Sequence, residues 1–592
     1  MTYRAPLPDI MAVLRHAAGC DAAIREGLYG DLAMDDIAAI LGEAGTFAAE
    51  VIAPLNRLGD TDGARLVDRQ VVTTPGWRDA YRAWAAGGWN GLVAPGEWGG
   101  QGLPMLVQVA CLELWNSGSM AFAIGPTLTA AGIEALDIHG TPDLRRLYLP
   151  KLVSGAWMGT MNLTEPQAGT DLSALKTRAE RAGDGTYRVT GTKIFITYGD
   201  HDLTDNIVHM VLARLPDAPP GNRGISLFLV PKFIVNPDGS LGDRNDVVCQ
   251  SLEHKLGIHG SPTCVMTFGD KGGATAYLVG EENRGLACMF TMMNNARLAV
   301  GVQGVGVAER AFQQALGYAR ERRQGRRPDT PAGQSAAIIA FPDVRRMLMT
   351  MKALTQAARA ICYLTASALD RARLAPDADA RRRAHETASL LTPIAKAFST
   401  DIGFEVASLG VQVHGGMGYI EETGAAQHLR DARIAMIYEG TNGIQAIDLV
   451  TRKIGQSEGA AVHAQIAAIR RTATRLLAAN RPGLGLTAAR LRGAAESLDR
   501  ATSYLLAALQ AGRTDDALAG ATSYLRLFAL VQGLASLADI ALADGDDAPE
   551  RASHEAVARF FAEHVTIGAD GLAAEVMGGA GVLGESPAVL FA

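Results

Sequence analysis

The chain has few cysteines for its length, and their spacing excludes the usual roles of clustered thiols. Six are scattered over 592 residues, at Cys20, Cys111, Cys249, Cys264, Cys288 and Cys362. None forms a C-x-x-C pair, so the sequence indicates neither a disulfide framework nor a zinc site. We therefore expect no metal site, and we expect a reducing, cytoplasmic setting.

Basic charge is also scarce, and this argues against nucleic acid as the main partner. The net charge is −7 and the pI is about 6.0. Residues 456–592 hold eleven Arg, no Lys and fifteen Asp or Glu. No large basic field is therefore available to bind a phosphate backbone.

Targeting and membrane signals are missing as well. Residues 1–6 lack the apolar core of a signal peptide. We find no apolar run long enough to cross a bilayer, so we expect no integral membrane segment. Tryptophan is absent after residue 157, and we expect most of the six to pack in local cores: Trp77, Trp84, Trp89, Trp98, Trp115 and Trp157.

The composition is that of a soluble globular protein, and the patterning predicts an α+β multidomain fold. Hydrophobic residues make up 48% and charged residues 20%, and the length suggests about three or four domains. After an N-terminal extension (1–34) we expect a helical domain (35–155), a small antiparallel β domain (156–284), a four-helix-bundle domain (285–455) and an additional C-terminal helical domain (456–592).

Periodicity supports each of these assignments. The expected strands alternate with a period of two, at Tyr187–Thr197, Ile207–Leu212 and Ile225–Val230. The bundle helices are expected at Met292–Gln324, Asp343–Leu374, Arg381–Leu409 and Ile444–Ile454. The C-terminal helices are expected at Val462–Asn480, Leu486–Gln510, Asp515–Ala543 and Arg551–Met577. A Rossmann fold is not supported, because no βαβ alternation or G-x-G-x-x-G follows a strand.

One carboxylate stands out as a candidate general base. Glu439 follows an apolar stretch and is followed at once by Gly440. Apolar neighbours disfavour the charged form and raise the pKa toward working pH, as a general base requires. The alternative is a glutamate that caps the helix containing Ile444. Taken alone, these residues favour the cap; the rest of the chain favours the base.

Three motifs together carry a family resemblance. In order they are Thr164-Glu165-Pro166-Gln167-Ala168-Gly169-Thr170-Asp171, Lys193-Ile194-Phe195-Ile196-Thr197, and Arg430-Asp431-Ala432-Arg433 followed by Tyr438-Glu439-Gly440-Thr441. Over residues 35–455 the chain resembles the acyl-CoA dehydrogenase family, and its two ends resemble the longer subgroup with an extra C-terminal helical domain. The resemblance implies FAD, an acyl-CoA substrate, and electron transfer to an electron-transfer flavoprotein.

The resemblance also assigns roles to individual residues. The family's base falls on Glu439; the alternative base position of some relatives falls on Ala296, which cannot serve. Cofactor-binding positions fall on Met161, Leu163, Thr164, Phe195, Thr197, Arg322, Gln412, Gly415, Gly416 and Thr441. Substrate-binding positions fall on Thr170, Asn294, Arg297 and Gly440. The arginine that the resemblance places at the FAD pyrophosphate is Arg322 or Arg323. The choice is open because the family's Arg-x-x-Phe-Gly pattern is shortened here to Arg322-Arg323-Gln324-Gly325. His259, Ser261 and His414 are either ligand neighbours or structural residues.

Three functions are compatible with this resemblance. The first is an acyl-CoA dehydrogenase that makes a trans-2-enoyl-CoA. The second is an acyl-CoA oxidase, which passes electrons to oxygen. The third is a DNA-binding alkylation-response protein of the same fold, against which the acidic C-terminal region argues. We expect a homo-oligomer, and a dimer if the C-terminal domain covers the surface that shorter relatives use to pair dimers.

Overall fold

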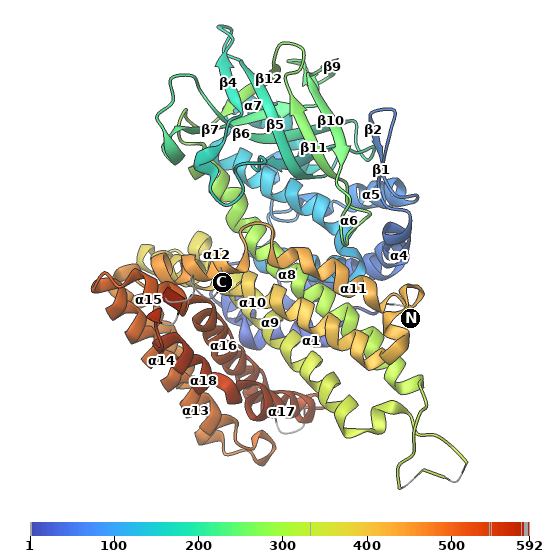
Figure 1. Ribbon diagram of the computed structural model, residues 1–592, viewed down its shortest axis with the longest axis vertical. Coiled ribbons are helices and arrows are strands. Elements are labelled where there is room, and N and C mark those ends of the chain that lie inside the picture. The colour runs from blue at the N-terminus through green and yellow to red at the C-terminus, as the bar shows by residue number, and fades with distance from the viewer. Residues whose placement is uncertain are drawn as a thin grey trace. The chain divides into compact units, whose positions relative to one another are not determined.

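The computed structural model describes residues 3–328, 330–331, 333–543, 545, 548–581, 583–584 and 590. The chain divides into two compact units that alternate along the sequence. The helical unit comprises Met1–Thr46, Met105–Ser117 and Arg297–Ala592, and the sheet unit comprises Phe47–Pro104 and Gly118–Ala296. Figure 1 shows the elements of both units.

Among the described residues, the sheet unit contains an eight-stranded sheet with the order β10-β11-β5-β12-β7-β6-β3, and β4 pairs with β5 and β6. The strands are β3 Trp157–Asn162, β4 Arg178–Arg181, β5 Tyr187–Thr197, β6 Asn206–Arg214, β7 Ile225–Pro231, β10 Val247–Leu252, β11 Thr263–Phe268 and β12 Ala274–Val279. The three strands expected from the sequence are confirmed as β5, β6 and β7. Most neighbours are antiparallel as expected, whereas β3 runs parallel to β6.

Two short hairpins and several helices complete the first 300 residues. The hairpins are β1 Arg65–Val67 with β2 Gln70–Val72, and β8 Phe233–Val235 with β9 Leu241–Arg244. The helices are α1 Leu7–Ala12, α2 Cys20–Arg25, α3 Met34–Phe47, α4 Ala53–Thr61, α5 Trp77–Ala86, α6 Met105–His139 and α7 Pro142–Val153.

Aromatic packing explains the tryptophan-rich beginning of the chain. Trp77 and Trp84 both meet Phe122 edge-on, with ring centroids 5.6 and 6.1 Å apart. Trp115 and Trp157 are also buried. Edge-on aromatic pairs add stability beyond the apolar area that they bury. The expected packing role is confirmed for these four side chains.

The four helices expected in residues 285–455 are present with somewhat different ends. They are α8 Gly285–Glu321, α9 Pro342–Leu374, α10 Ala378–His414 and α12 Asn442–Asp448, with α11 Ala425–Ala432 between the last two. The side chain of Asp377 accepts a hydrogen bond from the Ala380 amide at 2.7 Å and so begins α10. The last α-helix ends at Asp448 rather than at Ile454, because the chain changes there to a π-helical turn, Leu449–Lys453.

The C-terminal segment is helical but more interrupted than expected. It contains α13 Ala460–Ala479, α14 Thr487–Gln510, α15 Thr514–Ala519, α16 Ala521–Ala543, α17 Arg551–Phe560 and α18 Ala569–Met577. The single helix expected at 515–543 is wrong: it breaks at Gly520, where a Cβ would lie 2.9 Å from the backbone of Val576. The helix expected at 551–577 is likewise divided, by a π-helical turn at Phe561–Val565.

The helix α16 is the centre of this C-terminal segment. It packs on α9, α10 and α12 of the bundle and on α14 and α18 of its own segment. The helix approaches α9 closely at Gly533, where a Cβ would lie 2.9 Å from the Cβ of Ala357. Glycine therefore allows the two helices to lie closer together than a larger side chain would permit.

We expected no apolar segment long enough to cross a membrane, and this was wrong: three helices among the described residues are long and apolar enough, judged by length and composition alone. In the described part of the chain, Met34–Thr61, Met105–His139 and Ala521–Ala543 all reach that limit. The most apolar windows of the last two are 94% and 83% buried inside the protein. Packing in a protein core therefore accounts for the apolar character of those two segments, whereas the window in the first is only 33% buried.

A buried ion cluster joins three helices of the helical unit. The guanidinium of Arg359 on α9 contacts Glu113 on α6 at 2.6 Å and Glu309 on α8 at 2.8 Å. The hydroxyl of Tyr363 donates to Glu113 at 2.7 Å. All three charged side chains are 2% exposed or less. Removing the central cation would leave two buried carboxylates without a counter-charge.

We expect Arg359→Ala to destabilise the protein by about 3–5 kcal/mol, because Glu113 and Glu309 would lose their counter-charge. The measurement is the midpoint of urea unfolding, monitored by circular dichroism. The matched control is Arg382→Ala, which removes an exposed pair with Glu386 and is expected to cost about 1 kcal/mol or less. Equal midpoints for the two variants would show that the cluster is no more important than a surface pair.

Candidate functional site

The segment carrying Glu439 is a turn in the left-handed region of backbone conformation. The φ angles are 56° at Glu439 and 85° at Gly440. A left-handed glutamate is uncommon, and such strain persists only where neighbouring contacts fix it. Thr441, not Glu439, caps α12, because its hydroxyl accepts from the amide of Ile444 at 3.3 Å. The capping interpretation of Glu439 is therefore wrong.

The surroundings of the Glu439 carboxylate raise its pKa. Burial disfavours the charged form, and the positive charges of Arg297 and Lys396 oppose that effect without cancelling it. Arg297 extends from α8, is 9% exposed, and lies 4.0 Å from Asp448. The structure thus brings Glu439, Gly440 and Arg297 together, as the sequence predicts. A partly buried carboxylate with a raised pKa and a nearby cation suits proton abstraction.

Three polar side chains around this turn were missed by the sequence analysis. Gln445 donates to the carbonyl oxygens of Glu439 and Gly440, at 3.3 and 3.2 Å. Lys396 donates to the carbonyl oxygen of Gly440 and to the side chain of Asn442, both at 2.9 Å. The one sequence signal for Lys396 is its position as a lone lysine in the apolar run 390–398.

In the sheet unit, a second buried ion pair fixes the loop that follows β3. Lys193 on β5 lies 2.8 Å from Glu165, and the two side chains are 0% and 3% exposed. Lys193 also donates to the carbonyl oxygen of Leu163, and the Ile194 amide donates to that of Thr164, both at 3.0 Å. The predicted cofactor residues Leu163 and Thr164 are thereby held against β5.

Charges and hydrogen bonds set the pKa values of this pair. Burial alone would raise the pKa of Glu165, but the charge of Lys193 and hydrogen bonds from Lys193, Thr177 and Lys176 lower it to about 2. Burial lowers the pKa of Lys193 to about 8, against the attraction of Glu165. The pair is therefore ionised at neutral pH.

Phe195 lies exposed at a bulge in β5. The register between β5 and β11 shifts between Cys264 and Met266, so Ile194 and Phe195 together oppose one residue of β11. Phe195 has φ 61° and is 58% exposed. Bulges re-aim side chains at functional sites. The bulge leaves the phenyl ring as an exposed flat surface beside the loop after β3; Met161 lies on β3 and Thr197 ends β5.

The remaining predicted cofactor residues lie at exposed positions of the helical unit. Gln412 is near the end of α10, and Gly415 and Gly416 begin the 3-10 turn that follows it. Arg322 and Arg323 follow the end of α8 and are exposed. Arg323 donates to the carbonyl oxygen of Ser335 at 3.1 Å, whereas Arg322 donates to the side chain of Gln324 at 3.3 Å.

The other predicted positions divide into exposed and structural residues. Thr170 and Asn294 are exposed in the sheet unit. The ring of His259 contacts the carbonyl oxygens of Asp60 and Lys255, at 3.0 and 2.8 Å, and Ser261 is fully buried. These contacts favour the structural interpretation of His259, and burial favours it for Ser261.

His414 is also a packed residue of the helical unit. Its ring stacks on Tyr318 with centroids 4.4 Å apart, and its Nδ1 lies 2.7 Å from the carbonyl oxygen of Gly410. Burial lowers the pKa of His414, which favours the neutral ring. Of the two interpretations left open by the sequence, the structural one is supported.

Family models match almost the whole chain. The N-terminal domain of acyl-CoA dehydrogenase matches residues 34–156, the middle domain residues 160–271, and the C-terminal domain residues 283–454. A further model, described as acetyl-CoA dehydrogenase C-terminal like, matches residues 461–586. The chain belongs to the acyl-CoA dehydrogenase family.

Relatives place this family member in the long subgroup. The 3-methylmercaptopropionyl-CoA dehydrogenase of Ruegeria pomeroyi is 47% identical over 582 residues, which cover 96% of each chain. Two solved structures share the fold at 21% identity. They are Caenorhabditis elegans ACDH-11 in complex with C11-CoA (TM-score 0.77, 96% and 92% of the two chains) and an acyl-CoA dehydrogenase from Bacillus anthracis complexed with FAD (TM-score 0.74, 92% and 88%).

FAD is the cofactor of the acyl-CoA dehydrogenase family, and the residues of the sheet unit fit a flavin. A flavin ring needs a flat apolar contact and polar groups at its edge. The exposed ring of Phe195 offers the flat apolar contact. The loop containing Leu163 and Thr164, which is held against β5, offers the polar groups. Phe195 offers an aromatic face for stacking and has no side-chain N–H donor.

We expect Glu165→Gln to lower flavin content and to destabilise the protein by about 3–5 kcal/mol, because Lys193 would keep a buried charge without its carboxylate. The measurements are the ratio of flavin to protein absorbance and the melting temperature. Glu180→Gln, an exposed change on β4, is the matched control. Flavin content equal to that control would contradict a role for the pair in shaping the loop.

The same pair predicts resistance to acid. The pKa of Glu165 is lowered from 4.5 to about 2 in the folded protein. The contribution of Glu165 to stability is therefore fully present above pH 4.5 and is lost only as the pH falls toward 2. As the pH falls from 4.5 toward 2, we expect the wild type and Glu180→Gln to lose less flavin than Glu165→Gln does; equal loss by all three proteins would contradict this.

Proposed function

We propose that this protein is an FAD-dependent acyl-CoA dehydrogenase that converts an acyl-CoA thioester to a trans-2-enoyl-CoA. The observation that carries the proposal is Glu439: a carboxylate with a raised pKa on a left-handed turn, next to Arg297, in a chain of this family. We further propose a cytoplasmic location and an electron-transfer flavoprotein as the electron acceptor.

The chemistry divides between one side chain and the cofactor. Glu439 takes the α-proton as general base, and so becomes neutral, while the β-hydrogen leaves with its electron pair. Bound FAD supplies the hydride acceptor. The α C–H beside a thioester is weakly acidic, so the base must be desolvated and correctly oriented. Hydrogen bonding from the backbone of the Glu439 turn to the thioester oxygen would make that proton more acidic.

The other predicted residues are assigned to binding. Phe195, Thr197, Met161, Leu163 and Thr164 would hold the flavin ring. Arg322 is the better candidate for the pyrophosphate, because the guanidinium of Arg323 is bound to the backbone of Ser335. For the adenosine end we propose Gln412, Gly415 and Gly416 of a neighbouring subunit, and we propose that Thr441 also contacts the cofactor. For the acyl-CoA we propose Arg297, Gly440, Thr170 and Asn294.

The substrate class is best found by titration. An anaerobic sample is titrated with acyl-CoAs of short, medium and long chain and with a thioether acyl-CoA, which the relative from Ruegeria pomeroyi suggests. Bleaching of the flavin band by one class supports the dehydrogenase half-reaction and identifies that class. A flavoprotein that none of them bleaches would contradict the proposed reaction. Reoxidation of the bleached enzyme by oxygen as fast as by an electron-transfer flavoprotein would favour the oxidase instead.

We expect Glu439→Gln to keep FAD and to slow flavin bleaching by at least about 100-fold, because the amide cannot accept the α-proton. Stopped-flow absorbance at the flavin band measures this rate. In the wild type, the rate should rise with pH through a pKa above the ordinary value of 4.5, because burial raises the pKa of Glu439. Glu422→Gln, exposed in the same domain, is the control. Bleaching of Glu439→Gln at the wild-type rate would place the base elsewhere.

We propose a homodimer, because the C-terminal segment covers a face of the bundle formed by α9, α10 and α12. Light scattering of the purified protein should then give a mass twice that of the 62.3 kDa chain. A tetrameric mass would contradict this role of the C-terminal segment.

A further inference from the structure

Lys396 is a fully buried lysine that the proposed mechanism does not use. It lies in the middle of α10, in a stretch of apolar residues, and is 0% exposed. Burying an ammonium is costly unless it is hydrogen-bonded and close to opposite charge. Both conditions are met at one place, the turn that carries Glu439. The lysine donates at 2.9 Å to the carbonyl oxygen of Gly440 and at 2.9 Å to the side-chain oxygen of Asn442.

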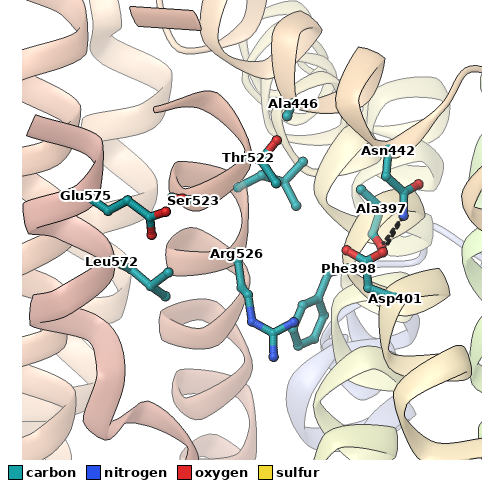
Figure 2. Close-up of a pocket in the computed structure, with 11 residues that line it drawn as sticks. Ala397, Phe398, Asp401, Asn442, Ala446, Thr522, Ser523, Arg526, Leu572 and Glu575 are labelled. Carbon is teal, nitrogen blue, oxygen red and sulfur yellow. Dashed lines mark hydrogen bonds between the residues drawn. The ribbon is translucent and has the colours of Figure 1, made fainter. Parts of the chain in front are cut away.

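Asn442 extends this contact into a network between the turn and α10. Its side-chain nitrogen donates to the carboxylate of Asp401 at 2.7 Å and to the carbonyl oxygen of Ala397 at 3.1 Å. Figure 2 shows Asn442 and Asp401 pointing toward each other at the edge of a pocket of about 250 Å³. The residues immediately after Glu439 are therefore bound to α10 at two points, Gly440 and Asn442.

The charge of Lys396 also acts on the Glu439 carboxylate. Burial lowers the pKa of Lys396 to about 7, while the negative charges of Glu439 and Asp401 favour its charged form and Arg297 opposes it. Burial raises the pKa of Asp401, and the charge of Arg526 on α16 opposes this effect. Burial and the charge of Glu439 raise the pKa of Tyr438, and the charges of Asp448, Arg452 and Lys453 lie close to Arg297. Below neutral pH, where Lys396 is protonated, it stabilises the ionised form of Glu439.

We propose that Lys396 is a positioning residue for the general base: it binds the Glu439–Asn442 turn to α10 and favours the reactive, ionised carboxylate. This inference rests on the proposed function. It assigns Lys396 no contact with substrate or flavin. A lysine with a purely structural role would affect folding and flavin content, but not the rate or the pH dependence of the folded holoenzyme.

The decisive variant is Lys396→Met, which keeps an unbranched side chain one atom shorter and removes its charge and donors. We expect the flavin of purified holoenzyme to bleach about 10–100-fold more slowly, with the apparent substrate affinity changed by less than about threefold. The acidic limb of the rate profile should move to higher pH, because the lost cation no longer favours the Glu439 carboxylate. Lys396→Arg should restore the position of that limb.

The matched control is Lys352→Met on α9, a partly buried lysine of the same unit whose ion pair is with Asp9. It should leave the bleaching rate and pH profile unchanged. If Lys396→Met does not fold, Asn442→Ala decides: it removes one anchor but keeps the charge, so the rate should fall with the acidic limb in place. An unchanged rate in Asn442→Ala would then overturn the proposal.

The outcomes separate this inference from the proposed function. A wild-type enzyme that no acyl-CoA bleaches would contradict the function itself. A wild-type enzyme that bleaches, a Glu439→Gln variant that does not, and a Lys396→Met holoenzyme with the kinetics of Lys352→Met would overturn only the role of Lys396.

Discussion

The buried guanidinium of Arg359 fixes the frame on which the rest of the helical unit depends. Its two carboxylate partners come from α6 and α8, while Arg359 itself is on α9. The three helices must therefore keep one relative register for the charges to remain paired. Since α8 carries Arg297 and α10 packs along α9, that register also determines where the cation from α8 and the amine from α10 meet the Glu439 turn.

The two units use buried charge in the same way near their strained backbone. In the helical unit, a buried lysine binds the turn where Glu439 and Gly440 have positive φ. In the sheet unit, another buried lysine binds the loop after β3, next to the bulge where Phe195 has positive φ. Strained conformations persist only where surrounding contacts determine them. An ammonium suits this task, because it has three donors and binds carbonyl oxygens from different segments at once.

The sequence predicted which helices and strands form better than where they end. It also predicted the motifs of the candidate site better than the tertiary contacts that hold those motifs in place. Alternation located β5 to the residue, because one face of that strand is buried. The helix expected over 515–543 was wrong: it breaks at Gly520, which packs against the distant backbone of Val576, and no local pattern shows that contact. The apolar length of α6 and α16 was missed because a few polar residues interrupt each run.

At the candidate site, Glu439 and Gly440 were predicted because they lie in a local motif, and Arg297 because its position matches the family. Lys396 was not, because its partners are 44 and 46 residues away and only the folded chain brings them together. The same holds for Glu165 and Lys193: both stand in quoted motifs, but nothing in either motif indicates that they pair. The bulge at Phe195 depends on its register with β11, which no pattern within β5 reveals.

The close approach of α16 to α9 has an evolutionary consequence. At Gly533 the two helices leave no room for a further carbon atom beside Ala357, and the surfaces of α9, α10 and α12 under α16 are fitted to it. A stop codon upstream of α16 would expose those apolar surfaces to water in a single step. Loss of this extension would therefore require compensating substitutions on the surface of the bundle.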